Sequence, residues 1–248
     1  MKLLLIAFAG LISLLSIASA NNPHDEKIEK NKTTDATDSD GIDYYEQQLH
    51  NLYTECELND KLEFNFFKQA LAGYKSLELS KKKILSIIDF SKPSTEERFF
   101  IIDVENYKLL YQTLVAHGKN SGYLNATKFS NRMGSHKSSL GFYRTDKSYF
   151  GKRGYSLQLE GLEKGINDNA RLRGIVIHGA NYVNEKYTNG NNMIGRSWGC
   201  PAVSKKLNKE IIELLKGGSC LFIYAEDELY KERSMIANLH LSENSNLN

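Results

Sequence analysis

A series of short apolar runs between residues 86 and 225 constrains the fold more than any other feature of the sequence. The runs are rich in β-branched and aromatic residues, and turn-forming Gly and Ser residues lie between them. Runs of this length with turn residues at both ends predict β-strands. The predicted strands are 86–90, 98–104, 109–116, 140–143, 155–159, 174–178 and 220–225. We therefore predict a mostly antiparallel sheet or a barrel.

Two other regions have the apolar spacing of helices. Between residues 44 and 88, apolar side chains recur three and four positions apart, which predicts two or three helices with Asn59 and Asp60 between them. Residues 206–215 carry one apolar stripe and form the only clear helix of the second half. The expected fold class is α+β but mostly β, with a small helical region, 43–88, packing on a sheet-rich domain, 89–230.

The first twenty residues have the features of a signal peptide. Lys2 precedes an apolar stretch, 3–17, and Ala18, Ser19 and Ala20 give the small-residue pattern that signal peptidase cleaves. The alternative is a retained membrane anchor, because the stretch is nearly long enough to span a bilayer. No later stretch has eighteen consecutive apolar residues. We therefore expect no stable membrane span after cleavage, and export to a periplasm or secretion at the cell envelope.

Both ends of the mature chain are polar. Residues 21–42 contain six acidic residues, three lysines and no aromatic residue, so they cannot bury enough apolar surface to fold. They are predicted to form a disordered linker. Residues 231–248 end in the sequence SENSNLN and are predicted to form a polar C-terminal tail.

The overall charge excludes one class of partner. The chain has 32 basic and 30 acidic residues, a net charge of +2, whereas a nucleic-acid-binding domain is strongly basic. We therefore expect no nucleic-acid partner. Residues 117–153 are locally basic, with eight Lys or Arg and one acid, Asp146. This stretch is either a solvated face or a rim that attracts anionic groups to a cleft.

The cysteines and two histidines give little indication of disulfides or metals. Three cysteines are too few for a disulfide scaffold, and none lies in a CxxC pair. His117 and His136 have no carboxylate or cysteine at ligand spacing, so no metal site is expected there. Cys56 and Cys220 either form a disulfide between the helical region and the sheet or stay buried as single thiols.

Candidate catalytic residues are concentrated in residues 173–204. An apolar strand ends at His178 and Gly179, and a loop rich in Asn and Gly leads to a turn that contains Cys200. A cysteine nucleophile needs a base within hydrogen-bond reach and surroundings that favour the thiolate. Glycines in the turn let backbone amides converge on a developing oxyanion. The alternative is that Cys200 is a small buried hydrophobe and His178 a satisfied strand-end residue.

The histidine and the cysteine lie in two short motifs, HGA at 178–180 and SWGCP at 197–201. These motifs resemble those of the YkuD-type L,D-transpeptidases, in which a histidine precedes a Ser-x-Gly-Cys turn. The closer resemblance is to the murein L,D-transpeptidase catalytic domain branch, from near Phe66 to Tyr224. Further matching stretches, in the family's order, are 87–103, 115–122, 129–143, 154–170 and 173–183.

The resemblance implies an L,D-transpeptidase-like β-sandwich or barrel that acts on the stem peptides of peptidoglycan. Cys200 would attack the carbonyl of the third stem residue, diaminopimelate, and the terminal D-alanine would leave. The acyl group would then pass from the Cys thioester to an amine on a neighbouring stem. By the same resemblance His178 is the base, and the carbonyl of Gly179 orients its imidazole.

The resemblance also assigns roles within the turn. The amides of Trp198, Gly199 and Cys200 would form the oxyanion hole, with Ser197 supporting the turn. No metal or organic cofactor is implied, since a thiolate suffices for this acyl transfer.

The chain departs from the wider family within the turn. Trp198 stands where most members have a second histidine, and Pro201 and Ala202 stand where most have an apolar residue and then Arg or Asn. Transpeptidation, L,D-carboxypeptidation and attachment of a surface protein therefore stay open. An alternative of another class is a non-catalytic cell-wall-binding module. Trp198 is either a lid or substrate platform in the cleft, or part of the core.

Overall fold

The computed structural model describes residues 39–81, 83–188 and 193–238. The predicted signal peptide and residues 21–38 of the predicted linker lie outside the described residues. Within the described ranges are helices α1 (Ser39–Glu55), α2 (Phe64–Ser76), α3 (Asn208–Leu215) and α4 (Glu228–Arg233), and the 3-10 helix η1 (Glu185–Tyr187). None of these helices is long and apolar enough to cross a bilayer. The strands are β1 (Ile84–Asp89), β2 (Phe99–Asp103), β3 (Lys108–Thr113), β4 (Gly141–Gly151), β5 (Gly154–Gly161), β6 (Val176–Ala180), β7 (Ala202–Ser204) and β8 (Cys220–Tyr224).

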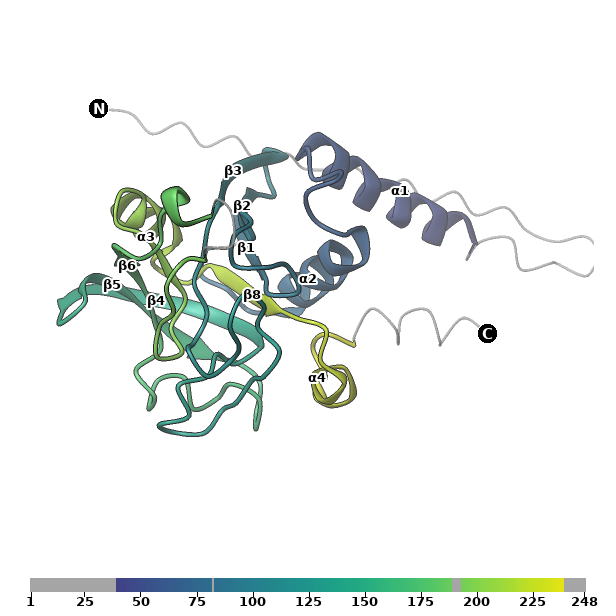
Figure 1. Cartoon of the computed structure of the whole chain (residues 1–248). Helices are drawn as coiled ribbons and strands as arrows, with labels where there is room; N and C mark the ends of the chain where they lie inside the picture. Colours follow the sequence, from purple (N-terminus) through teal and green to yellow (C-terminus); the bar gives the residue numbers. More distant parts are fainter. Residues whose placement is uncertain (1–38, 82, 189–192, 239–248) are drawn as a thin grey trace, which may run out of the picture. The chain divides into compact units, whose positions relative to one another are not determined.

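The strands of the described residues form one mixed sheet with the order β3-β2-β1-β8-β4-β5-β6-β7 (Figure 1). Adjacent strands are antiparallel except β1 with β8 and β6 with β7, which are parallel. After β3 the chain crosses to the opposite edge of the sheet, where Ala116 pairs with Ala202 of β7. The Ala116 amide donates to the Ala202 carbonyl at 2.8 Å. This pairing nearly closes the sheet into a barrel.

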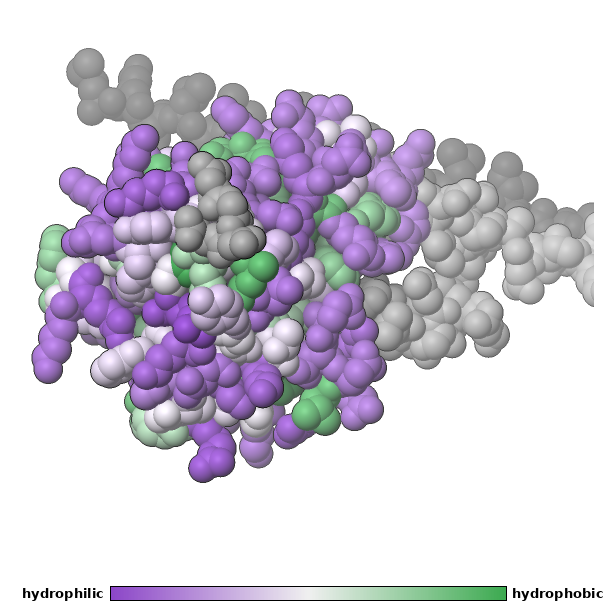
Figure 2. Space-filling view, in the orientation of Figure 1, coloured by the Kyte–Doolittle hydropathy of each residue, from purple (hydrophilic) through white to green (hydrophobic). Residues whose placement is uncertain are grey.

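The strands at one end of this order are buried on both faces. Every residue of β1, β2 and β8 is buried, which explains why their sequences are continuous apolar runs without alternation. Helices α1 and α2 lie beside this part of the sheet in Figure 1, and Leu52, Phe67 and Leu71 share one apolar core with it. Hydrophilic residues prevail on the face seen in Figure 2, as expected if the apolar runs lie inside.

The predicted fold class is confirmed, because a small helical region precedes a mostly β domain with a nearly closed sheet. Each predicted strand occurs with shifted ends, and β4 extends eight residues further than predicted, to Gly151. Strand β7 and helix α4 have no counterpart in the sequence prediction, because three and six residues are too few to show a periodic pattern. Helix α1 begins at Ser39, inside the stretch predicted as linker.

The chain packs against the domain beyond residue 230, where the polar tail is predicted to begin. The Glu163 carboxylate accepts hydrogen bonds from the Phe142 amide at 2.6 Å, the Tyr230 hydroxyl at 3.3 Å and the Ser234 hydroxyl. Ser234 and Ala237 are both buried. The packed chain therefore extends to at least residue 237, because the Ser234 hydroxyl is bonded to the buried carboxylate and the Ala237 carbonyl accepts a hydrogen bond from the Gln69 side chain of α2 at 3.2 Å.

All three cysteines lie in the described residues, and each is a buried free thiol. The disulfide between Cys56 and Cys220, one of the two alternatives, is therefore not formed in this structure. Burial raises the pKa of Cys56 to about 11 and raises that of Cys220 even further. Thiols with such raised pKa values are unreactive at neutral pH, so Cys56 and Cys220 have structural roles.

Helix α2 lies close to the sheet at Gly73. A Cβ atom at this position would be 2.2 Å from the ring Cζ of Phe142 in β4. We expect Gly73→Ala to lower the free energy of unfolding by about 1–3 kcal/mol, because overpacking outweighs the gain in helix propensity of about 1 kcal/mol. Denaturant titration measures the difference.

The matched control uses the obstructing ring. In a Phe142→Leu background the methyl group has more room, so Gly73→Ala should cost less there than in the wild type, and the two substitutions should be non-additive. Equal costs in both backgrounds would contradict the close approach of α2 to β4.

Candidate active site

The pairing of β6 with β7 brings His178 and Cys200 together. The two strands are parallel, and His178 stands opposite Ala202, two residues after Cys200. Just before β7, the carbonyl of Pro201 accepts a hydrogen bond from the His178 amide at 3.3 Å. Residues 22 positions apart in the sequence therefore lie on neighbouring segments at one edge of the sheet.

The turn that carries Cys200 requires glycine at position 199. Gly199 has a φ of +118°, which side chains rarely tolerate, and a Cβ atom there would lie 2.8 Å from the Lys137 carbonyl oxygen. The Ser197 hydroxyl crosses the turn: it donates to the Cys200 carbonyl at 2.6 Å and accepts from the Gly199 amide at 3.0 Å. Ser197 therefore fixes the shape of the turn.

A second segment, residues 115–119, holds the same turn from outside. The Ser197 amide donates to the His117 carbonyl at 2.9 Å, and the Lys119 amide donates to the Ser197 carbonyl at 2.8 Å. The buried guanidinium of Arg98 donates to Nδ1 of His117 at 2.8 Å and to the Val115 carbonyl at 2.9 Å. Burial, together with this cation, lowers the pKa of His117 to about 4, so its imidazole is neutral.

The His178 imidazole is oriented so that it can act as a base. Its Nδ1 lies 3.2 Å from the Gly179 carbonyl oxygen. Because a carbonyl only accepts, Nδ1 carries the proton and Nε2 has a free lone pair. Burial lowers the pKa of His178, and the nearby Arg153 lowers it further, against the opposite effect of the Gly179 carbonyl. Nε2 is buried and has no hydrogen-bond partner within the described part of the chain.

The Cys200 thiol is protected in this state. Its side chain is buried, and Sγ donates a hydrogen bond to the Gly174 carbonyl at 3.6 Å. Burial raises the pKa of Cys200, and the Val176 amide and the cations of Arg153 and Arg173 offset part of this effect. The site therefore combines a neutral thiol with a neutral imidazole. Contrary to the expectation from the sequence, the surroundings do not favour the thiolate in the resting state.

The backbone amides of the turn are not equivalent. The Gly199 amide, one of three expected to form an oxyanion hole, donates to the Ser197 hydroxyl. It is thus already engaged in this state, and the amides of Trp198 and Cys200 are the better candidates for binding an oxyanion. The Trp198 side chain is 60% exposed, which rules out a position in the core.

Two residues near this pair have no role in the sequence prediction. Arg153, in the turn between β4 and β5, interacts electrostatically with Cys200, His178 and Tyr182. The Tyr182 hydroxyl is buried without a hydrogen-bond partner in the described ranges. A Cβ atom at Gly195 would lie 2.5 Å from the Tyr182 Cβ, so this glycine makes room for the tyrosine. The position of Tyr182, four residues after the histidine, is the one sequence signal that could have pointed to it.

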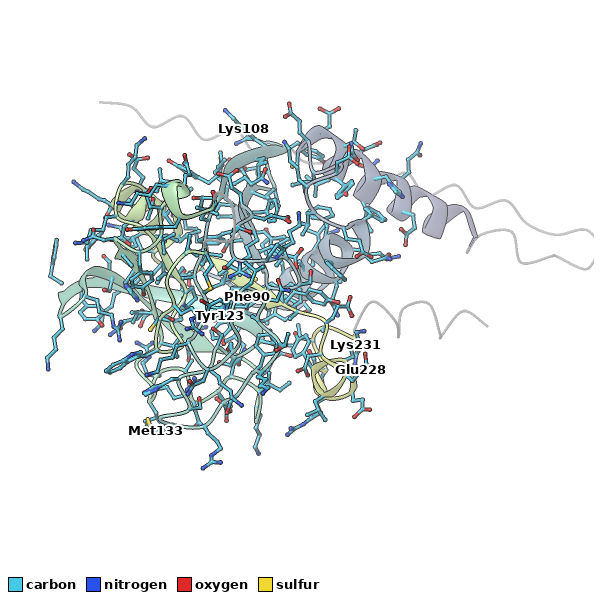
Figure 3. All side chains as sticks on the ribbon, in the orientation of Figure 1. Phe90, Lys108, Tyr123, Met133, Glu228 and Lys231 are labelled. Carbon is cyan, nitrogen blue, oxygen red and sulfur yellow. The ribbon has the colours of Figure 1, made fainter. Side chains whose placement is uncertain are left out.

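Arg173 holds the loop of residues 130–139 next to the site through hydrogen bonds. Its guanidinium donates to the Ser130 carbonyl at 2.7 Å, to the Ser139 hydroxyl at 3.0 Å and to the Lys137 carbonyl. Met133, in the same loop, lies at the lower edge of the molecule in Figure 3 and is exposed. The inner end of the loop is therefore fixed beside Gly199, and its tip faces solvent.

The protected thiol predicts how Cys200 responds to pH. Carbamidomethylation by iodoacetamide, followed by peptide mapping, should show a Cys200 rate that rises with pH to a midpoint no lower than that of an exposed cysteine. The reason is that burial disfavours the thiolate. Arg153→Gln should move the midpoint upward, because it removes a cation that stabilises the thiolate. A reaction rate already at its plateau below pH 7, typical of a thiolate–imidazolium pair, would contradict the neutral resting state.

A family model described as "L,D-transpeptidase catalytic domain" matches residues 58–224, which is more than half of the chain and includes all eight strands, His178 and Cys200. No curated protein matches the chain significantly.

Several solved structures are similar to the chain at low identity. An L,D-transpeptidase from Mycobacterium smegmatis is 12% identical with a TM-score of 0.36, over 58% of this chain and 59% of that chain. L,D-transpeptidase 1 of Mycobacterium tuberculosis is 11% identical with a TM-score of 0.34, over 56% and 60%. A helical cell shape determining protein from Campylobacter jejuni is 13% identical with a TM-score of 0.38, over 73% and 62%.

The chain spans about three fifths of the length of these solved proteins. Because their identities and TM-scores are low, the assignment rests on the family model, which covers the sheet, the turn and the Cys–His pair. On this basis the chain belongs to the L,D-transpeptidase catalytic domain family.

Proposed function

We propose that the protein is an exported cysteine acyltransferase that performs L,D-transpeptidation on peptidoglycan stem peptides through a Cys200 thioester. One observation carries the proposal: the unpartnered Nε2 lone pair of His178 lies next to the turn of Cys200, in a chain of this family. The support for export is the N-terminal sequence, where Lys2, an apolar stretch and an Ala-Ser-Ala site follow one another.

The first half of the reaction cleaves a peptide bond. The Cys200 thiol gives its proton to Nε2 of His178, and Sγ forms a bond to the carbonyl carbon of the third stem residue. The resulting oxyanion receives hydrogen bonds from the amides of Trp198 and Cys200. As the carbonyl re-forms, the C–N bond to D-alanine breaks, and the imidazolium gives its proton to the leaving amine.

The second half forms the cross-link. An amine on a neighbouring stem gives a proton to Nε2 and attacks the thioester carbonyl, and Cys200 leaves as a thiolate that takes the proton back. Attack by water in place of the amine gives a free acid, which is L,D-carboxypeptidation. Attack by an amine of a surface protein gives attachment. The three reactions share every group on the enzyme and differ only in the acceptor.

The resting geometry makes the first step depend on a rearrangement. Sγ is bonded to the Gly174 carbonyl and is not bonded to His178, so the thiol must rotate toward Nε2 before proton transfer. Catalytic hydrogen bonds are often formed only in the complex with substrate. We therefore assign the activated thiol to the substrate complex and the neutral thiol to the free protein.

Incubation of the mature protein with disaccharide-tetrapeptide, followed by mass spectrometry, tests the proposal. Release of D-alanine together with a cross-linked dimer is expected, and Cys200→Ala should reduce both products at least a thousandfold, because the nucleophile is lost. Cys56→Ala is the matched control and should remain active, since this buried thiol directly follows α1 in the helical region and is not part of the turn at 197–201.

The outcomes separate the alternatives. Release of D-alanine without a dimer would indicate a carboxypeptidase. Undiminished turnover by a folded Cys200→Ala variant would sink the thioester mechanism. Binding of the peptide without release by the wild type would indicate the non-catalytic wall-binding module.

A further inference from the structure

We propose that Lys119, Arg153 and Trp198 form a subsite that binds a carboxylate of the peptide substrate beside Cys200. The inference rests on the proposed function for the identity of the substrate, and on the structure for the position and charge of the subsite.

The centre of the subsite is the exposed indole of Trp198. The Lys119 ammonium lies 5.5 Å from the centroid of this ring, and the Arg153 guanidinium carbon lies 5.8 Å from it. The His136 imidazole is stacked on the same side chain, with centroids 5.0 Å apart and ring planes 26° apart. An exposed indole with an imidazole stacked on it and two cations close to it forms a small, oriented group of donors.

The backbone segments that carry Lys119 and Arg153 are both held by hydrogen bonds. The amide of Lys119 is bonded to the Ser197 carbonyl, and Gly118 forms a β-bridge with Ser197, one residue before Trp198. Arg153 lies in the tight turn of the β4–β5 hairpin, which is closed by the pairing of Gly151 with Gly154. Although the two side chains are long, the backbone positions of Lys119 and Arg153 are fixed. This limits the conformational entropy that the protein loses when it binds a ligand there.

The two cations have no acidic partner among the described residues. Other basic residues have acidic partners, such as Arg144 with Glu160 and Arg171 with Asp146. Neither Lys119 nor Arg153 forms an ion pair within the described ranges. Two like charges at one ring repel each other, and contact with the indole offsets only part of that cost. An anion bound at this ring would offset both positive charges and relieve the repulsion.

The subsite adjoins the reacting atoms. Trp198 is two residues from Cys200, and Arg153 acts electrostatically on both Cys200 and His178. A bound anion must therefore belong to a residue next to the attacked carbonyl. In the proposed substrate two carboxylates meet this condition: the terminal one of D-alanine and the side-chain one of the third residue. Guanidinium and ammonium groups both bind carboxylates through charge-assisted hydrogen bonds.

Direct binding tests the subsite without the need for turnover. The Cys200→Ala protein is titrated calorimetrically with the tetrapeptide and with two analogues, one amidated at the terminal carboxylate and one at the side-chain carboxylate. Arg153→Gln and Lys119→Gln should each raise the dissociation constant for the tetrapeptide by about tenfold, a loss typical of a charge-assisted contact. Neither substitution should affect binding of the analogue in which the recognised carboxylate is amidated.

Matched controls address charge and folding. Lys152→Gln removes the neighbouring charge of the same hairpin turn and should leave the dissociation constant within twofold of the starting protein. Trp198→Phe keeps an aromatic ring and should weaken binding less than Trp198→Ala. Thermal unfolding of each variant checks that the fold is retained.

Unchanged dissociation constants in Arg153→Gln and Lys119→Gln would overturn the proposal. So would equal losses on the tetrapeptide and on both analogues, since these would show a general field effect without a carboxylate contact. If only the proposed function is wrong, the wild type will not release D-alanine, but Arg153→Gln and Lys119→Gln will still lose binding of the carboxylate selectively. The two failures can therefore be told apart.

Discussion

The site depends on backbone pairing between three segments that meet at the closing edge of the barrel. The turn before β7 is bonded on one side to the His178 amide of β6 and on the other side to residues 116–119. These are main-chain hydrogen bonds inside a buried region, where an unmade bond costs about 1–3 kcal/mol. The position of Cys200 relative to His178 is therefore set by closure of the sheet.

The electrostatic surroundings of Cys200 and His178 favour the neutral forms of both side chains. Burial disfavours both the thiolate of Cys200 and the imidazolium of His178, so both groups are neutral in the free protein. Arg153 affects the two groups differently from burial: its positive charge stabilises the Cys200 thiolate and destabilises the His178 imidazolium. In an oxidising compartment a neutral, buried thiol is also less readily oxidised than an exposed thiolate. Low reactivity in the free protein is thus compatible with catalysis in the complex.

The sequence was sufficient for local features and insufficient for contacts made only in three dimensions. Apolar runs predicted the long strands, and the motifs around His178 and Cys200 predicted the candidate pair, since both signals lie within short segments. The sequence does not distinguish Arg153 from the seven other basic residues of 117–153. Only the β4–β5 hairpin brings it close to Trp198. The hydrogen bond from Cys200 to the Gly174 carbonyl is likewise invisible in the sequence, because it joins residues 26 positions apart.

The buried guanidinium of Arg98 restricts how residues 115–117 align with the start of β2. It is completely buried, and its acceptors are the carbonyls of Lys92 and Val115 and the ring nitrogen of His117. Successive residues of an extended segment alternate in direction, so a shift of residues 115–117 by one position would remove the Val115 carbonyl and the His117 ring nitrogen and leave only the Lys92 carbonyl of these acceptors. Each hydrogen bond lost by a buried charged group costs about 1.5–3 kcal/mol. Arg98 therefore favours a single alignment of residues 115–117, and these residues in turn hold the turn that carries Cys200.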